Sequence, residues 1–423
     1  MIYDETLNYL YGLERFGIRL GLENISAVLH RLDNPHHQFN SIHITGTNGK
    51  GSTAVMIASI LQSAGYKTGL YTSPHLQDFR ERIMVNNIMI PEEDVIKLMD
   101  LIKREMYEFS PLTFFEFTTI MAFLYFSREK VDFAVVEVGM GGRLDATNVV
   151  NPIVSIITEV DIEHTDHLGK NIKSISREKG GIIKNNGVVI LSSLKRDVIE
   201  TIESICNERH AKFYRIGRHF SGEIIYGDIK YQRFKFKNSD YFLDKLEIPL
   251  LGRHQIVNAS TAVETALILK KGGVKIGEGV IRKGLKGVKL KGRLEILRNN
   301  PFIVVDVAHN PSAAKILAGE LKKINYNKLI LILGILKDKD SSGIISFLAP
   351  IANHIIIVKP KTPRSSNPQN LKMKAMKYIK MVEIIEDISD AISRAINTAD
   401  KKDLICITGS FFTVGEALEK LND

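Results

Sequence analysis

A short segment near the start of the chain carries the residue types of a phosphate-binding loop. It is the run Gly46-Thr47-Asn48-Gly49-Lys50-Gly51-Ser52. Glycines let backbone N–H groups approach an anion without interference from a Cβ atom, and Lys50 supplies a mobile cation. The spacing departs from the common G-x-x-x-x-G-K-S/T pattern, because Gly51 separates Lys50 from Ser52 and Ile44 stands at the first glycine position. The strand and helix expected on either side favour nucleotide binding over an ordinary glycine-rich turn.

Two polar residues, Glu137 and His164, are expected to lie beside this loop. Glu137 is at the end of the apolar run 133–138, and His164 follows the next apolar run, 154–158. Because the carboxyl ends of parallel strands meet at one edge of a sheet, both side chains should reach that edge. A carboxylate suits Mg2+, whereas an imidazole is a less usual ligand. Taken singly, each residue is typical of an ordinary polar group, but their places after successive strands favour a metal site.

Alternating strand and helix patterns indicate the elements that position these residues. They predict a doubly wound, mostly parallel sheet that carries the phosphate loop. Strands are expected at residues 41–45, 68–71, 133–138, 154–158 and 188–191, and helices at 51–64, 92–107 and 113–128. Residues 212–250 change to a hairpin-like alternation, which precedes a helix at 254–269.

A second and smaller series of strands and helices follows, and it predicts a Rossmann-like α/β domain. Strands are expected at residues 302–307, 328–335, 355–358 and 404–408, with a helix at 312–324. Asn299-Asn300-Pro301 supplies turn chemistry, so that the boundary falls near residues 290–300. The chain is thus divided into a nucleotide-binding domain over residues 1–293 and a C-terminal domain over residues 294–423, and the boundary segment is a candidate hinge.

Composition limits the class of protein. The 423 residues are 44% hydrophobic and 25% charged, with a formal net charge of +9. Lysines and arginines are spread along the chain without a continuous basic stripe, so that no nucleic acid partner is expected. No run of about 18 uncharged apolar residues occurs, and a cytoplasmic protein without a membrane partner is expected. Cys206 and Cys406 match neither a zinc motif nor a disulfide framework.

The variant phosphate loop resembles that of the Mur ligase superfamily, and the motifs after it resemble those of folylpolyglutamate synthases in particular. In the first part of the chain these motifs occupy residues 71–76, 80–83, 137–148, 161–169 and 178–184. In the second part they occupy residues 292–295, 306–311, 334–340 and 408–410, in the order that the family shows. The resemblance therefore extends over almost the whole chain and is more specific than the phosphate loop alone.

The resemblance implies an ATP-dependent ligase that adds L-glutamate to the terminal glutamate carboxylate of a reduced folate through an acyl phosphate. Residues 46–52 would then bind ATP, and the family's ligands to two magnesium ions match Ser73, Glu137 and His164. The matching Lys179 would be carbamylated and become an anionic oxygen ligand, although its place at the end of an expected helix is also typical of an exposed lysine. Lys50, His164 and Lys179 would have catalytic roles.

Four further residues match the remaining ATP contacts of the family: Asn258, Arg293, Asp306 and His309. Arg293 would face the phosphates across a cleft, where a guanidinium can compensate developing charge. Asp306 and His309 lie at an expected strand-to-helix turn, a usual place for ligand binding. The family's Asp-Gly-Ala-His-Asn-Pro has Val307 in place of glycine here, a departure that concerns the backbone of the turn.

The sequence restricts the class of substrate only in part. The phosphate loop begins at Gly46, which leaves little room for the N-terminal domain by which peptidoglycan ligases bind UDP-linked substrates, and this favours a pterin. Residues 73–82 and 113–117 are candidate pterin contacts, but for Phe114, Phe115 and Phe117 core packing is favoured. Dihydrofolate synthase activity, another Mur-type amide ligase, a P-loop NTPase acting on a polyanion and a nucleotide-binding regulator stay open. A monomer is expected.

Overall fold

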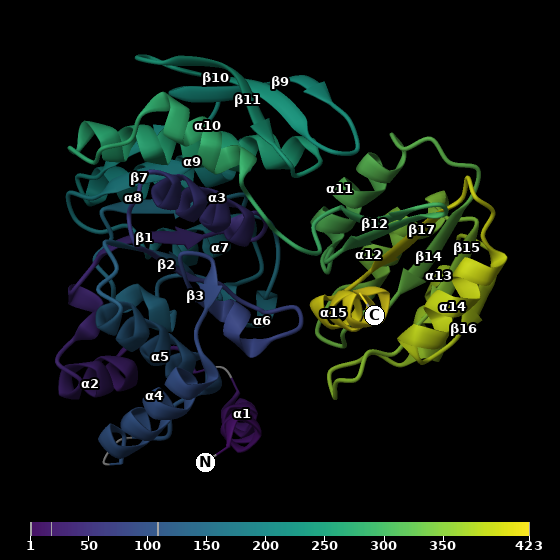
Figure 1. Ribbon diagram of the computed structural model, residues 1–423, viewed down its shortest axis with the longest axis horizontal. Coiled ribbons are helices and arrows are strands. Elements are labelled where there is room, and N and C mark those ends of the chain that lie inside the picture. The colour runs from purple at the N-terminus through teal and green to yellow at the C-terminus, as the bar shows by residue number, and fades with distance from the viewer. Residues whose placement is uncertain (1, 18, 108–109, 423) are drawn as a thin grey trace.

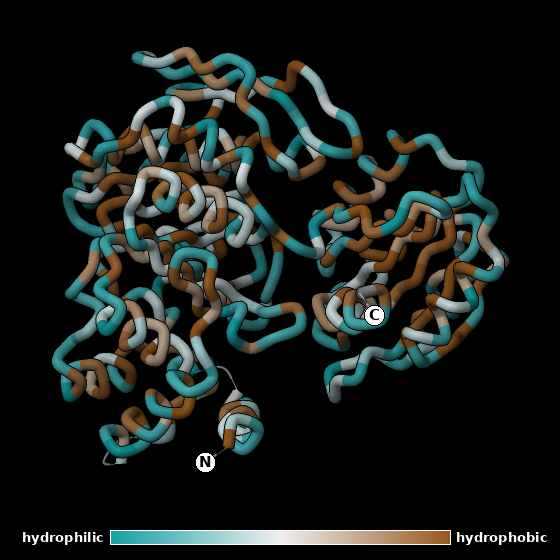
Figure 2. The backbone as a smooth tube through the Cα atoms, in the orientation of Figure 1, coloured by the Kyte–Doolittle hydropathy of each residue, from teal (hydrophilic) through white to brown (hydrophobic). Residues whose placement is uncertain are grey.

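The computed structural model describes residues 2–17, 19–107 and 110–422. It consists of two α/β bodies that lie side by side, a larger one coloured purple to green and a smaller one coloured green to yellow (Figure 1). Each body contains a sheet covered by helices, and the brown apolar segments gather in the sheets (Figure 2). These features confirm the predicted fold class.

The larger sheet has eight strands in the order β4-β3-β2-β5-β1-β6-β7-β8. Six of them run parallel: β1 (Asn40–Thr45), β2 (Thr68–Tyr71), β5 (Phe133–Glu137), β6 (Val154–Ile157), β7 (Val188–Leu191) and β8 (Lys212–Arg215). Antiparallel pairings add β3 (Ile83–Val85) and β4 (Ile88–Met89) at one edge. Because β1 lies between β5 and β6, the loops that follow these three strands are neighbours at the carboxyl edge.

Helices cover both faces of this sheet, because side chains on successive strand residues point to opposite faces. On β5, Val135 packs with α3 (Lys50–Ser63), α9 (Arg253–Lys271) and α10 (Glu278–Lys286). Ala134 and Val136 pack on the other face with α1 (Tyr3–Gly12), α2 (Glu23–Arg31), α4 (Glu92–Glu105) and α5 (Phe114–Arg128). A third cluster joins α6 (Thr165–Leu168), α7 (Ile172–Gly180) and α8 (Arg196–Glu208). Burial on both faces explains why apolar residues occupy most positions of the central strands β5, β6 and β7.

Two segments of the larger body differ from the sequence expectation. Residues 212–215 were expected in a hairpin but form β8, which pairs in parallel with β7. The rest of that region forms an antiparallel sheet of β9 (Phe220–Gly227), β10 (Gln232–Asn238) and β11 (Phe242–Ile248). Helix α10, at residues 278–286, is not expected from the sequence. Its glycines and lysines obscure an apolar face, and Gly284 lets α10 approach α3, since a Cβ atom there would lie 2.5 Å from Ile60 Cα.

The smaller sheet has six strands in the order β12-β13-β17-β14-β15-β16. They are β12 (Glu295–Asn299), which is antiparallel, and the parallel β13 (Phe302–Asp306), β14 (Leu329–Leu333), β15 (His354–Ile357), β16 (Val382–Ile384) and β17 (Leu404–Thr408). One face packs on α11 (Pro311–Leu321), α12 (Ser341–Leu348) and α13 (Pro368–Ala375), and the other on α14 (Ile388–Thr398) and α15 (Phe411–Asn422).

Short 3-10 helices complete the fold: η1 (Leu13–Phe16), η2 (Pro35–His37), η3 (Phe79–Arg82), η4 (Ala146–Val149) and η5 (Ala349–Ile351). The elements predicted by position in the two bodies are present, with ends that differ by at most three residues. None of the helices in the described part of the chain combines the length and the apolarity needed to cross a bilayer.

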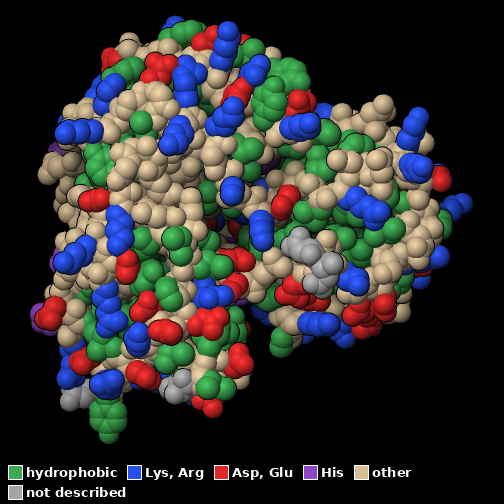
Figure 3. Space-filling view, in the orientation of Figure 1, with side chains coloured by type: hydrophobic (Ala, Val, Ile, Leu, Met, Phe, Trp, Pro, Cys, Tyr) green, Lys and Arg blue, Asp and Glu red, His purple; other side chains and the backbone are tan. Residues whose placement is uncertain are grey.

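The two bodies meet at the carboxyl edge of the larger sheet. Asn310 Nδ2, at the start of α11, donates to Asn48 Oδ1 in the phosphate loop (3.0 Å). Leu76, from the loop after β2, packs against the apolar cluster that includes α15. Figure 3 shows the recess that remains between the bodies, with charged side chains around it. The strand-end loops of the larger body therefore face the smaller body.

Candidate active site

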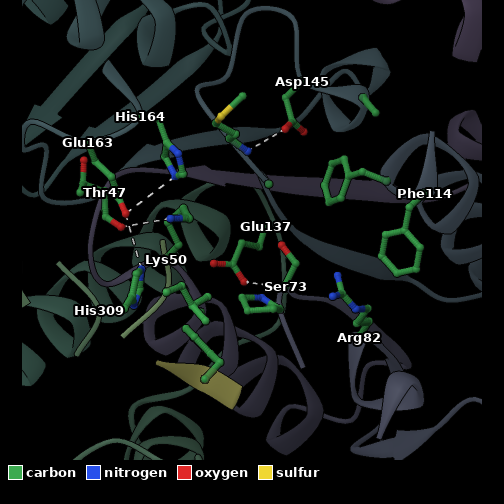
Figure 4. A pocket seen from close by; sticks show the side chains of 18 of the residues that line it. Thr47, Lys50, Ser73, Arg82, Phe114, Glu137, Asp145, Glu163, His164 and His309 are labelled. Atoms are coloured by element: carbon green, nitrogen blue, oxygen red, sulfur yellow. Dashed lines mark hydrogen bonds and ion pairs between the residues drawn. The ribbon is translucent and has the colours of Figure 1, made fainter. Parts of the chain in front are cut away.

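A cavity of about 410 Å³ lies where the two bodies meet. Ten residues predicted for the site line it: Thr47, Asn48, Gly49, Lys50, Gly51, Ser73, Glu137, His164, Arg293 and His309. The other five predicted residues are not in this lining: Gly46, Ser52, Lys179, Asn258 and Asp306. In Figure 4, Glu137 lies in the middle of the cavity, His164 and His309 lie on one side, and Arg82 and Phe114 lie on the other. The cavity therefore has a phosphate-loop side and an aromatic side.

Glycines give the phosphate loop its shape. Gly46 and Gly49 have φ angles of 150° and 92°, which residues with side chains rarely adopt. A Cβ atom at Gly49 would lie 2.5 Å from Asn258 Oδ1, so that Asn258 on α9 supports the loop from behind. Helix α3 begins at Lys50 and directs its N-terminal N–H groups at the loop. Lys50 Nζ donates to Gly46 O (3.0 Å) and Thr47 O (3.1 Å), so that the cation is folded onto its own loop.

Glu137 and Ser73 face the phosphate loop from the ends of β5 and β2. Glu137 is buried, Ser73 N donates to its Oε2 atom (3.1 Å), and a Cβ atom at Gly51 would lie 3.5 Å from that oxygen. Burial raises the pKa of Glu137, and the charge of Lys50 opposes this effect. A divalent cation would stabilise the buried carboxylate, since it prefers carboxylate and phosphate oxygens. Glu137 and Ser73 thus fit the predicted metal site.

Protein side chains alone do not complete such a site. In the described ranges, no three or more His, Cys, Asp or Glu side chains converge closely enough to hold a metal ion. Magnesium usually keeps few protein carboxylates and takes its other oxygens from substrate phosphates and water. The arrangement therefore fits a cation that binds together with a nucleotide.

His164 reaches the same edge, as predicted from its place after β6. It precedes α6 with a left-handed φ of 52°, and its Nε2 atom lies 3.7 Å from Glu163 Oε1. Burial lowers the pKa of His164 to about 4, so that its ring is neutral at neutral pH. A neutral imidazole has an unprotonated nitrogen that can bind a metal.

Lys179 is buried near the end of α7, so that the alternative of an exposed helix-terminal lysine is wrong. Its Nζ atom donates to Gly46 O (2.8 Å), the carbonyl that also accepts from Lys50. Burial lowers the pKa of Lys179 to about 7, and the charge of Lys50 adds to this effect. A large share of the amine is therefore neutral at neutral pH. Lys184 Nζ instead donates to Asn148 O (2.9 Å).

The smaller body presents Arg293 and His309 to the cavity. The Arg293 guanidinium lies 5.3 Å from the centre of the Phe411 ring. His309 Nδ1 contacts Val307 O (2.9 Å), which leaves Nε2 directed at Glu163, 3.5 Å from Oε1. These two cationic or hydrogen-bonding groups face the phosphate loop from the opposite body.

Asp306 lies at the predicted strand-to-helix turn but does not line the cavity. It accepts from Leu294 N and Ala308 N, both at 2.9 Å, and so it fixes the turn between β13 and α11. Val307, at the family's glycine position, is buried and donates its N–H to Gly292 O (3.0 Å). These three hydrogen bonds lie behind the cavity wall, where Asp306 supports Arg293 and His309.

Sequence reasoning missed the link between Glu163 and the smaller body. Glu163 Oε1 lies 3.2 Å from Lys339 Nζ and 3.5 Å from His309 Nε2. Burial alone would raise the pKa of Glu163, but the hydrogen bond from His309 and the charge of Lys339 hold that pKa well below its usual range. The available signal was that Glu163 and Lys339 stand in two of the family motifs, 161–169 and 334–340.

The aromatic side of the cavity contains a buried cation. Arg82 Nε donates to His75 Nδ1 (2.8 Å), and the guanidinium lies 5.1 Å from the centre of the Phe114 ring. Phe115 also lines the cavity, whereas Phe117 is fully buried. Core packing is therefore confirmed for Phe117, whereas Phe114 and Phe115 are partly buried, pack against the same apolar cluster and also border the cavity.

Known protein families match both bodies. The Mur ligase middle domain matches residues 44–266, and the glutamate ligase domain of Mur ligases matches residues 292–411. The chain belongs to the Mur ligase family. The family predicted from the motifs is confirmed, and with it the assignment as an ATP-dependent ligase.

Members of this family resemble the chain over its full length. The folylpolyglutamate synthase of Lacticaseibacillus casei is 32% identical over 430 residues, which cover 100% of this chain and 99% of the relative. The structure of E. coli FolC in complex with DHPP and ADP is 32% identical, with a TM-score of 0.90, and the match covers 99% of this chain and 97% of that chain. The bifunctional folylpolyglutamate synthase/dihydrofolate synthase of Yersinia pestis, complexed with AMPPNP and a Mn ion, is 29% identical with a TM-score of 0.90. The match covers 100% of this chain and 98% of that chain.

Proposed function

We propose that this Mur ligase adds L-glutamate to the terminal glutamate carboxylate of a reduced folate, with ATP as the energy source. The observation that carries the proposal is the convergence of the phosphate loop, Glu137 and two residues of the smaller body, Arg293 and His309, on one cavity. The chain matches a folylpolyglutamate synthase from end to end. A pterin has room beside Phe114 and Arg82, on the side of the cavity away from the phosphate loop.

The reaction proceeds in two steps. A carboxylate oxygen of the folate attacks the γ-phosphorus of ATP, and the bond to ADP breaks, which gives an acyl phosphate. The amino group of L-glutamate then attacks the acyl carbon, loses a proton and displaces inorganic phosphate. Lys50 must leave its two carbonyl partners to reach the transferring phosphoryl group. Positioning and electrostatic stabilisation carry most of the catalysis, and the two bodies keep water from the acyl phosphate.

Ser73, Glu137 and His164 would hold magnesium, as two ions. When bound, the metal neutralises charge on the phosphoryl oxygens. The buried Glu137 and the neutral His164 ring support this assignment. Lys179 would act as a carbamate: its neutral amine can add carbon dioxide, and the lowered pKa and the contact with Gly46 support that role. His164, Lys50 and the modified Lys179 are the proposed catalytic groups.

The remaining residues would act around the nucleotide. Gly49 and Gly51 line the cavity and would give backbone N–H groups to the phosphates, and Arg293 would face them from the smaller body. Thr47 also lines the cavity, and its N–H donates to Glu159 O (2.7 Å), which would hold the loop in its phosphate-binding form. Gly46, Ser52, Asn258 and Asp306 would support this set from behind the lining, and Asn48 would act within it. We assign residues 1–293 and 294–423 to two domains, supported by the start of β12 at Glu295 and the left-handed Gly292. A monomeric state and a cytoplasmic location stay predictions.

A second activity, the joining of L-glutamate to dihydropteroate, uses the same chemistry and is favoured by the bifunctional relative. A phosphate-release assay tests both activities. ATP and Mg2+ are supplied with tetrahydrofolate or dihydropteroate, each with and without L-glutamate. Single-stranded DNA and a UDP-linked muropeptide are supplied in two separate arms. Release that requires a pterin and L-glutamate supports the proposal. Stimulation by DNA alone, or by a UDP-linked muropeptide alone, would replace it with an NTPase or with another Mur-type ligase.

A further inference from the structure

A chain of buried polar side chains runs from β1 to the wall of the cavity. His43 Nε2 lies 2.8 Å from Thr147 Oγ1, and Thr147 Oγ1 lies 2.6 Å from Asp145 Oδ1. Asp145 Oδ2 accepts from Met140 N (2.9 Å). His43 and Thr147 are fully buried and do not line the cavity, whereas Asp145 and Met140 do. This series of hydrogen bonds therefore links the interior of the sheet to the loop that follows Glu137.

The number of protons fixes the direction of each hydrogen bond. Burial raises the pKa of Asp145, but backbone N–H groups donate to both of its oxygens, from Thr147 (3.0 Å) and from Met140, and these hydrogen bonds favour its carboxylate form. A carboxylate only accepts, so that Thr147 gives its single hydroxyl proton to Asp145. The hydroxyl oxygen then accepts from His43. Burial lowers the pKa of His43 to about 3, so that the neutral ring carries its one proton on Nε2.

This arrangement leaves the other ring nitrogen of His43 without a partner. Nδ1 is buried and accepts no hydrogen bond from the residues that the structure describes. A buried polar atom without a partner destabilises the fold. The strand neighbours Ile42 and Ile44 are apolar and equally buried, so that an apolar residue at position 43 would avoid this cost. Stability of the core therefore does not explain the histidine.

The same strand holds the same loop at a second point. Thr45 lies two residues after His43 on the same face of β1, and its hydroxyl donates to Gly141 O (2.5 Å). The next residue, Gly46, begins the phosphate loop. At the start of the loop 139–145, a Cβ atom on Gly139 would lie 2.5 Å from Phe115 Cζ, so that this loop is packed against the aromatic side of the cavity. Strand β1 thus connects the phosphate loop with the wall that faces the second substrate.

We propose that His43 is a positioning residue, which holds the loop 139–145 in register with the phosphate loop through Thr147 and Asp145. The proposal rests on the ligase function, because that function requires a carboxylate to be aligned with a phosphorus atom across this wall. Without the donor at position 43, Thr147 loses one partner and Asp145 and its loop shift. Alignment of the folate with ATP then suffers, whereas ATP still binds through the intact phosphate loop.

The test compares two substitutions at one position. His43→Leu removes the donor, whereas His43→Gln places an amide nitrogen where Nε2 was. His43→Leu should lower kcat/KM for the folate about tenfold, through displacement of the aligned groups, and leave the KM for ATP within about twofold. Its Tm should be unchanged or higher, since the unpartnered Nδ1 is gone. His43→Gln should retain most of the activity. Equal losses in both folded variants, or no loss in His43→Leu, would overturn the proposal.

Thr147→Val interrupts the same series of hydrogen bonds in its middle, and this variant provides the test if His43→Leu does not fold. When three residues act as one chain, the double variant His43→Leu/Thr147→Val should lose no more activity than the worse single variant. Additive losses would contradict the chain.

A readout that needs no substrate separates this proposal from the proposed function. Amide hydrogen exchange over residues 139–145 should be faster in His43→Leu than in the unsubstituted protein and unchanged in His43→Gln. Unchanged exchange in His43→Leu would overturn the positioning role, whatever the activity. Faster exchange in a protein that shows no ligase activity with any pterin would instead refute the proposed function alone.

Discussion

The carboxyl edges of the two sheets place an acid in similar positions and use it differently. At the edge of the larger sheet, Glu137 accepts one hydrogen bond within the described structure, from Ser73 N, and lines the cavity. At the edge of the smaller sheet, Asp306 accepts two backbone N–H groups and does not line the cavity. The comparison shows that the local backbone donors decide whether a strand-end acid is available to a ligand. The larger sheet presents its acid to the cavity, whereas the smaller sheet uses its acid to fix the turn that precedes His309.

Removal of charge at Glu137 should have the largest effect. Glu137→Gln should lower kcat on the order of 10³-fold, since one anionic ligand of the proposed magnesium site, which neutralises the transferring phosphoryl group, is lost. Nucleotide binding should persist through Lys50 and the loop amides. Steady-state turnover and equilibrium binding of a fluorescent ATP analogue measure the two quantities separately. Turnover within tenfold of the unsubstituted protein would exclude Glu137 from the metal site.

Lys179 should rank next, and Lys184 provides a matched control from the same segment of the larger body. Lys179→Ala should lower kcat about 100-fold, an effect typical of lost ligand support at a metal. Lys184→Ala should stay within a few-fold, because its amine contacts Asn148 and not the phosphate loop. Acetate or formate should partly restore Lys179→Ala by filling the space of the carbamate. Mass spectrometry that shows an unmodified Lys179 in active enzyme supplied with carbon dioxide would contradict the carbamate and leave the ligase function standing.

Asp306 tests the other half of the comparison, with Asp403 as its control. Asp403 is also buried in the smaller body and accepts from Lys328 N (3.1 Å) and Asp400 N (2.9 Å), at the far end of the sheet. Substitution of either residue by Asn should lower the free energy of unfolding by about 1–3 kcal/mol, because one backbone N–H then meets an NH2 group. Asp306→Asn should also lower kcat about tenfold, since the turn that carries His309 moves. Equal activity of the two folded variants would show that Asp306 does not support the cavity.

The last prediction concerns the pH dependence of stability rather than turnover, and it compares two histidines, His43 in the larger sheet and His354 in the smaller one. Burial lowers the pKa of His43 to about 3, below its ordinary value of 6.5, so that the unfolded chain takes up a proton first as the pH falls. This contribution to stability is complete above pH 6.5 and is lost toward pH 3, at about 1.4 kcal/mol per pH unit. His43→Leu should remove that slope from denaturant unfolding measured between pH 6 and pH 4. His354→Gln should reduce this pH dependence of the unfolding free energy by less, because Glu383, 3.0 Å away, opposes the effect of burial on the pKa of His354. Equal slopes for all three proteins would contradict the buried neutral form of His43.

The sequence predicts what depends on local pattern. The strands before Gly46 and His164, and the strand that ends at Glu137, are short runs rich in β-branched residues, so that both the fold class and the shared sheet edge follow from them. The sequence does not predict burial that depends on packing between distant segments. Lys179 meets Gly46 across 133 residues, and Lys339 meets Glu163 across 176 residues. In the same way, the role of Asp306 depends on a backbone N–H from Leu294, outside its own motif.

The central claim is that the protein activates a folate carboxylate as an acyl phosphate, which the amino group of L-glutamate then attacks. The most direct measurement is the formation of the glutamylated product, followed by mass spectrometry, with [18O]-labelled carboxylate on the folate. The account predicts a gain of one glutamate that requires ATP and Mg2+, together with the transfer of one 18O atom to inorganic phosphate. Product formed without 18O in the phosphate, or ATP hydrolysis that is independent of folate and glutamate, would contradict it.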